Sequence, residues 1–198
     1  MENWLAISPW LGIILWMIVY ISDYYLTIHS ARGFLEIKHF HFEGSFELTP
    51  QYQKDVDSLN PISKRHITLL LVYSLVIYLL WWLCIRLFYL PWAYELYLGM
   101  FLLMEVAVHM RHFRNIFLIR ELRKGNGVDG EIHYRKWFSY RVSMFDFILF
   151  GILFLIVFLL TLSPFFLGGA IMCFGIAFRH SRLSKKVKSE SQQNIEAK

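Results

Sequence analysis

The chain has 198 residues, of which 57% are hydrophobic and 18% aromatic, and its formal net charge is +5. A mean hydropathy of +0.43 is too high for a soluble domain of this size, and the apolar residues come in long blocks. The basic residues lie at the ends of these blocks, and no soluble basic segment is long enough to bind nucleic acid. The composition therefore predicts an all-α polytopic membrane protein with no nucleic-acid partner.

Five apolar blocks are candidates for transmembrane helices. They cover about 5–28, 67–90, 92–113, 144–162 and 164–179. The polar loops 29–66 and 114–143 are expected to form a small cap that contains short β-strands. The basic and polar tail 184–198 has the composition of a disordered segment. We therefore expect the chain to form a single membrane domain.

The first block contains one carboxylate, Asp23, near its C-terminal end. A carboxylate inside the apolar layer of a membrane costs about 3 kcal/mol unless it has a partner or water. Asp23 is therefore the first candidate functional residue. The alternative is that Asp23 lies at the level of the lipid headgroups, in contact with water.

The loop 29–66 carries signals for a strand and for two helix starts. Apolar and polar residues alternate over 37–48, with the period of two that is typical of a strand. Thr49-Pro50 has the pattern of an N-cap followed by proline at the first helical position, and it predicts a short helix up to about residue 59. Ser63 is the expected N-cap of the second transmembrane helix.

The third block contains Glu105, His109 and His112, whose i, i+4, i+7 spacing places all three on one face of a helix. Glu105 lies deep in the apolar part, where an ionisable group is a functional hypothesis by default. The alternative is that Glu105 pairs with an arginine from a neighbouring helix end. In that case the two histidines lie in the wet interface.

The loop 114–143 combines basic residues with a second strand signal. Residues 131–136 (EIHYRK) alternate, and we expect them to form a short strand that pairs with the one near His39. Four arginines near the same membrane face are suited to anionic lipid headgroups or phosphate. They are Arg111, Arg114, Arg120 and Arg141.

The last two blocks form a hairpin that turns at Ser163-Pro164. The fourth block is almost purely hydrocarbon except for Asp146 at its start. The fifth is at the lower length limit of a membrane span. Its small residues would let it pack closely against a neighbouring helix, and they suggest a homo-oligomer that forms through this helix. These residues are Gly168, Gly169, Ala170 and Gly175.

The distribution of basic residues predicts the orientation in the membrane. Lysine and arginine number five in the first loop, eight in the third loop and its flanking helix ends, and six in the tail, whereas the other connections have one or none. Because basic loops stay in the cytosol, five helices with the N-terminus outside and the C-terminus in the cytosol fit best. We expect a multi-pass protein of the plasma (inner) membrane, with anionic lipids at its cytosolic face.

The candidate site is a polar cluster that faces the cytosol. Its members are Asp23, Glu105, His109, His112 and Asp146. Glu105, His109 and His112 supply possible ligands for a divalent metal, but no recognised metal-binding spacing supports this site. Cys84 and Cys173 lie inside apolar blocks, where we interpret them as small buried residues.

Three classes of function remain open. The first is an oligomeric channel or transporter for an ion or a small solute. The second is a membrane enzyme that acts on a lipid or isoprenoid substrate, although the repeated aspartates of such enzymes are absent from the sequence. The third is a membrane scaffold or accessory subunit, which becomes the best interpretation if Glu105 faces lipid without a polar neighbour.

Overall fold

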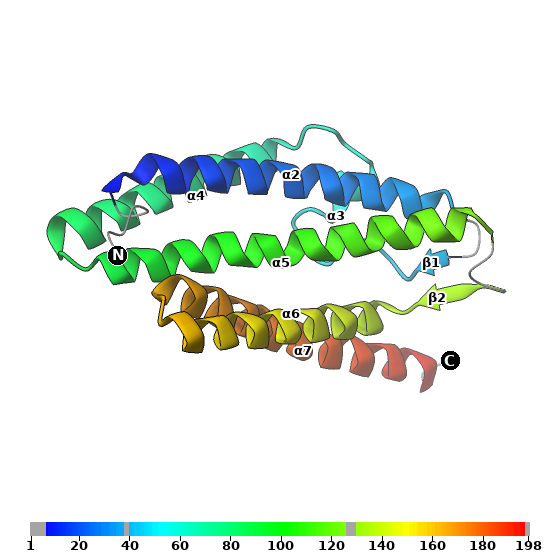
Figure 1. Cartoon of the computed structure of the whole chain (residues 1–198). Coiled ribbons are helices and arrows are strands. Elements are labelled where there is room, and N and C mark those ends of the chain that lie inside the picture. Colours follow the sequence, from blue (N-terminus) through cyan, green and yellow to red (C-terminus); the bar gives the residue numbers. More distant parts are fainter. Residues whose placement is uncertain (1–6, 38–39, 126–129, 197–198) are drawn as a thin grey trace.

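The apolar blocks fold as long helices with a two-stranded sheet at one end of the bundle (Figure 1). The computed structural model describes residues 7–37, 40–125 and 130–196. Within them, four helices are long and apolar enough to cross a membrane. They are α2 (Pro9–Leu35), α4 (Lys64–Trp81) with its π-helical continuation η1 (Trp82–Leu87), α5 (Pro91–Arg123) and α6 (Lys136–Thr161). This agrees with the expected class of all-α membrane protein.

Proline and serine mark where these helices begin. Pro9, Pro91 and Pro164 each occupy the first turn of a helix, where the missing N–H costs no hydrogen bond. Ser63 is the N-cap of α4, as expected, because its side chain accepts a hydrogen bond of 3.1 Å from the backbone N–H of His66.

The helices extend well beyond the apolar blocks. α2 continues to Leu35 and α5 to Arg123, while α6 begins at Lys136, so most of the expected loop 114–143 is helical. The expected start of the first span at residue 5 lies outside the described residues. Phe34 of α2 and Ile119 of α5 pack against the apolar residues of the cap, and Arg123 forms an ion pair with Glu36. These tertiary contacts stabilise the helix ends, and hydropathy does not detect them.

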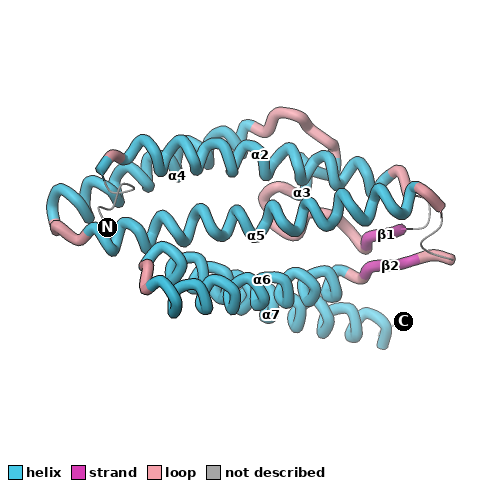
Figure 2. The backbone as a smooth tube through the Cα atoms, in the orientation of Figure 1, coloured by secondary structure: helices cyan, strands magenta, loops and turns pink. Residues whose placement is uncertain are grey.

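Helix α5 occupies the centre of the bundle (Figure 2). On one side it packs against α2, which in turn packs against α4, and on the other it packs against α7 (Pro164–Glu196). α7 forms an antiparallel hairpin with α6. One hydrophobic core lies between α2, α4 and α5, around the fully buried Trp16. A second core lies between α5, α6 and α7, around Phe147 and Cys173.

The small residues of α7 serve packing within the chain. A Cβ atom at Gly168 would overlap the backbone carbonyl oxygen of Leu96, and one at Gly169 would overlap the side chain of Leu103. Ala170 is also buried. These residues therefore pack closely against α5 of the same chain, as expected for a neighbouring helix, and the homo-oligomer through this helix stays a prediction. Gly175 has open space around its Cβ position.

The tail also differs from the sequence expectation of disorder over 184–198, because α7 continues as a helix to Glu196. Ser184 is buried and donates a hydrogen bond of 2.8 Å to the backbone oxygen of Trp137. The ammonium group of Lys188 lies 5.3 Å from the centre of the Trp137 ring. Contacts with the start of α6 thus support a segment whose composition alone does not predict a helix.

The cap joins the two loops. Strand β1 (Phe40–Phe42) pairs in parallel with β2 (Ile132–Tyr134), which confirms the expected pairing of these two segments, although His39 itself lies outside the described residues. The short helix α3 (Gln53–Asp57) begins later than Thr49-Pro50 because these residues form a turn, closed by a 3.0 Å bond from the Tyr52 N–H to the Thr49 oxygen.

Candidate functional site

The interface between α2 and α5 brings together four of the polar residues that the sequence singles out. Asp23 comes from α2, and Glu105, His109 and His112 come from one face of α5. One ligand atom each of Asp23, Glu105 and His109 lie within 4.8 Å of one another. The Nε2 atom of His112 lies 3.0 Å from Oδ1 of Asp23. We call these four residues the α2–α5 cluster.

His109 is held in a defined orientation. Its Nδ1 atom lies 2.7 Å from the backbone oxygen of Glu105, which can only accept, so Nδ1 carries a proton and donates. Its Nε2 atom lies 2.7 Å from the hydroxyl of Ser22. In the neutral ring Nε2 therefore holds the lone pair and points toward α2. A hydrogen bond from Nδ1 to a carbonyl is the arrangement that commonly orients a metal-binding histidine.

His112 bridges two residues of α2. Its Nε2 atom lies 3.0 Å from Asp23 and 3.1 Å from the hydroxyl oxygen of Thr27, and the ring is buried. Asp23 and Thr27 are one helical turn apart, so both face the same ring. His112 therefore fixes the register between the two helices at the level of the cluster.

Among the four residues of the cluster, Glu105 is the most buried. The residue is only 4% exposed, and its Oε2 atom has no hydrogen-bond partner in the described part of the chain. No ion pair of the described residues joins a lysine or arginine to Glu105 or to Asp23. Two neighbouring carboxylates without a lysine or arginine partner are costly in an apolar environment unless they bind a cation or a proton.

Asp146 lies apart from this cluster, on the α6 side of α5. Its carboxylate is 2.7 Å from Nη1 of Arg114 and 3.3 Å from Nε of Arg111. The guanidinium of Arg111 also lies 5.1 Å from the centre of the Phe147 ring. The position of Asp146 at the start of an apolar block indicates its depth, but it does not indicate which side of α5 it faces.

The four arginines expected to bind phosphate are dispersed. Arg111 and Arg114 bind Asp146, and Arg141 lies on α6 with its guanidinium 5.9 Å from the centre of the Trp137 ring. Arg120 lies exposed on the last turns of α5. Two of the four arginines are therefore already paired with a carboxylate, and binding of anionic headgroups by these residues stays a prediction.

The structure adds polar residues that the sequence analysis did not select. Ser22 and Thr27 supply hydroxyl groups to the two histidines, and their positions on either side of Asp23 could have indicated this. From the cap, the hydroxyl of Tyr52 lies 2.7 Å from that of Tyr20 on α2. Tyr20 in turn stacks on His66, with ring centres 4.3 Å apart.

The segment between β1 and α3 brings another carboxylate, Glu47, toward the site. Its Oε1 atom accepts a 2.6 Å hydrogen bond from the backbone N–H of Thr49. Burial raises the pKa of Glu47, and the hydrogen bonds with Thr49 oppose this rise. The nearby charges of Asp23 and Arg111 act on this pKa in opposite directions. Glu47 is therefore a further carboxyl group within electrostatic range of Asp23.

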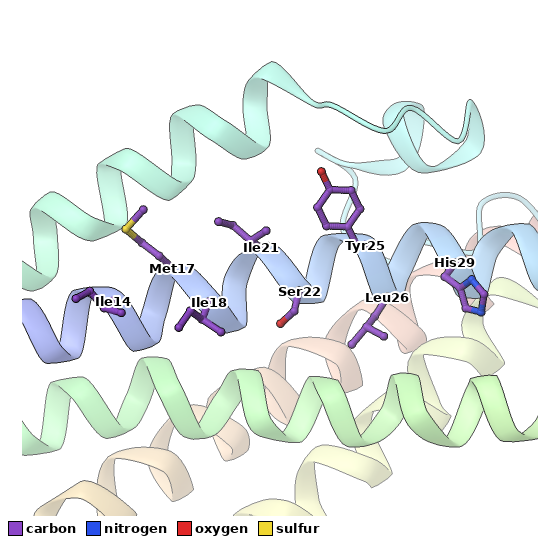
Figure 3. A pocket seen from close by; sticks show the side chains of 8 residues that line it. All are labelled: Ile14, Met17, Ile18, Ile21, Ser22, Tyr25, Leu26 and His29. Atoms are coloured by element: carbon purple, nitrogen blue, oxygen red, sulfur yellow. The ribbon is translucent and has the colours of Figure 1, made fainter.

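An apolar groove of about 930 Å³ runs along the outer face of α2 (Figure 3). Its lining residues are Ile14, Met17, Ile18, Ile21, Ser22, Tyr25, Leu26 and His29. In Figure 3, Met17, Ile21 and Tyr25 point away from α5, while Ser22 and Leu26 point toward it. Ser22 therefore both lines the groove and contacts His109, so the groove reaches the edge of the α2–α5 cluster.

Comparison with protein-family models, with curated proteins and with solved structures finds no significant match. The site is therefore interpreted from its own geometry.

Proposed function

We propose that this protein binds and transports a divalent cation, and that Asp23, Glu105 and His109 form the binding site between α2 and α5. The observation that carries the proposal is the approach of three ligand atoms to within 4.8 Å of one another inside membrane helices. A metal ion of charge +2 would balance the two carboxylates without any basic side chain. It would also supply the partner that Oε2 of Glu105 lacks among the described residues.

The donor set suits a first-row divalent metal. Two carboxylates and one imidazole favour ions such as Mn²⁺, Fe²⁺ or Zn²⁺ over K⁺ or Na⁺. His109 already presents Nε2 toward α2, and Ser22 is the group that a metal would displace from this nitrogen. His112 would hold Asp23 in position from the other side.

The proposal includes the expected topology of five spans, with the N-terminus outside. The cap and the C-terminal end of α7 lie at the same end of the bundle, which is consistent with one cytosolic face (Figure 1). Because so few helices form a thin bundle, we extend the proposal to an oligomer in the plasma (inner) membrane. The outward residues of α7, which include Gly175, are the surface left for a second copy.

A membrane enzyme that acts on a lipid is the second candidate, and the groove along α2 favours it. An acyl chain in this groove would bring a lipid headgroup near Ser22 and His109. A scaffold is the least favoured of the three classes, because Glu105 is buried beside other polar groups.

The test is Mn²⁺ uptake into sealed proteoliposomes that contain a fluorescent metal indicator. We expect wild-type protein to carry Mn²⁺ faster than protein-free vesicles. Glu105→Gln should lower the rate by about tenfold or more, because losing one charged ligand costs at least about 1.4 kcal/mol. Glu95→Gln is the matched control, since Glu95 is a buried carboxylate on the same helix but outside the cluster.

Two outcomes would overturn the proposal. One is a wild-type rate equal to that of protein-free vesicles, and the other is equal uptake by wild type and Glu105→Gln. If uptake is absent and a single lipid species copurifies with wild type but not with Glu105→Gln, the enzyme becomes the better interpretation.

A further inference from the structure

A second group of metal-ligating side chains lies on the cap, away from the α2–α5 cluster. The parallel register pairs His41 of β1 directly with His133 of β2. In both strands the central residue is exposed and its neighbours are partly buried, so the two imidazoles project from the same outer face of the sheet. Glu131, just before β2, is also exposed.

These three side chains are already close to the spacing of a metal site. The ring centres of His41 and His133 are 4.9 Å apart, with planes inclined by 24°. Nε2 of His133 lies 3.1 Å from Oε2 of Glu131. One ligand atom from each of the three residues lies within 4.8 Å of the others. A tetrahedral zinc ion needs these atoms about 3.4 Å apart, which small rotations of exposed side chains can achieve.

We propose that His41, Glu131 and His133 form a binding site for a divalent transition metal of the zinc class. Two imidazoles and one carboxylate match the three-ligand sites that leave a fourth position to water. Imidazole ligands favour Zn²⁺, Cu²⁺ and Ni²⁺, whereas Ca²⁺ and Mg²⁺ prefer oxygen ligands alone. This proposal does not depend on cation transport through the α2–α5 cluster.

A metal at this position would join two segments that lie far apart in the chain. Two strands of three residues each form a marginal sheet by themselves, so a metal bond across their central pair would add substantially to its stability. The segment that follows β1 carries Tyr52, which contacts Tyr20 on α2. The metal would therefore hold the part of the cap that adjoins the α2–α5 cluster.

The experiment measures Zn²⁺ binding to the full-length protein in lipid nanodiscs, purified without a histidine tag. We expect His41→Ala and His133→Ala to lose one equivalent of zinc relative to wild type, or to bind it about tenfold more weakly. His29→Ala is the matched control, because His29 is an exposed histidine on α2 outside the site. This control should bind as much zinc as wild type.

A rescue variant separates metal binding from simple damage to the cap. His133→Cys supplies a zinc ligand at the same position, so it should restore binding, and Co²⁺ should then give the visible absorption of a thiolate complex. Equal zinc binding by wild type, His41→Ala and His133→Ala would overturn the proposal, and so would failure of His133→Cys to bind.

Glu105→Gln keeps the two proposals distinguishable. This variant should keep the zinc bound at the cap while losing Mn²⁺ uptake. Zinc binding that is lost in Glu105→Gln but kept in His41→Ala and His133→Ala would place the zinc at the α2–α5 cluster, which also overturns the cap site.

Discussion

The buried carboxylates on the two sides of α5 have different partners. Toward α6, one carboxylate, Asp146, meets two guanidinium groups, those of Arg111 and Arg114. Toward α2, the two carboxylates of Asp23 and Glu105 meet imidazoles and hydroxyl groups, without an arginine or lysine in ion-pair contact among the described residues. In the first arrangement the carboxylate is paired with guanidinium groups of the same chain, whereas the second leaves a negative charge for a ligand to balance.

The packing of neighbouring helices against α5 also differs between its two sides. On the α7 side, glycines allow backbone to lie against backbone, which leaves no room for a ligand. On the α2 side, polar side chains of the cluster meet between the helices, and Ser22 connects the cluster to an open groove. Charge balance and packing together distinguish the structural face of α5 from its proposed binding face.

The largest expected effect is on the structural face. Gly168→Ala places a Cβ atom against the backbone of α5, which cannot move without displacing the helix. We expect a loss of about 3 kcal/mol or more in the free energy of unfolding, measured as a lower midpoint of thermal unfolding in nanodiscs. Gly175→Ala is the control, because a Cβ there meets open space. Equal midpoints for the two variants would show that α7 does not pack as described.

The next largest effect concerns the ion pairs of Asp146 with Arg111 and Arg114. Asp146→Asn leaves two guanidinium groups without their carboxylate and should lower stability by about 2–4 kcal/mol. This range is reduced because the Arg114 side chain is 42% exposed and its charge is partly screened by water. Asp146→Glu retains the charge and should lose much less. A thermal unfolding midpoint of Asp146→Asn at the wild-type value would contradict a structural role.

A substitution in the α2–α5 cluster should not lower the stability of the protein. Glu105→Gln removes a charge that has no basic partner, so we expect stability to stay constant or to rise by about 1 kcal/mol while Mn²⁺ uptake falls. A variant that loses function without losing stability identifies a binding residue. A drop in stability as large as that of Asp146→Asn would instead mean that Glu105 is held by structural contacts.

The smallest effect is the pH dependence contributed by Glu47. Burial raises the pKa of this carboxyl in the folded protein, so the folded state holds its proton to higher pH than the unfolded state does. Stability therefore falls as the pH rises from the ordinary glutamate pKa through the raised value. Glu47→Gln should remove this fall and raise the midpoint of thermal unfolding at pH 7 by about 1–2 °C. At pH 4 the two proteins should have the same midpoint of thermal unfolding. An equal gain in the midpoint of Glu47→Gln at pH 4 would show that the raised pKa is not its cause.

Sequence spacing could predict the part of the site that lies on one helix. The positions of Glu105, His109 and His112 follow from helical geometry, and the alternation in residues 131–136 predicted a strand and its partner. The side of α5 that meets Asp146 could not be predicted, because the rotation of α6 depends on contacts spread over the whole hairpin. The helical tail was missed for a similar reason, since Ser184 and Lys188 are stabilised by Trp137 on another helix.

The most direct test of a metal site between α2 and α5 is pulsed electron paramagnetic resonance of bound Mn²⁺. The background protein carries His41→Ala and His133→Ala, so that the cap contributes no imidazole ligand. A metal held by Asp23, Glu105 and His109 should show nuclear modulation from one coordinated imidazole nitrogen, and His109→Ala should abolish it. Modulation that is unchanged in His109→Ala, or absence of bound Mn²⁺ from the background protein, would contradict the proposed site.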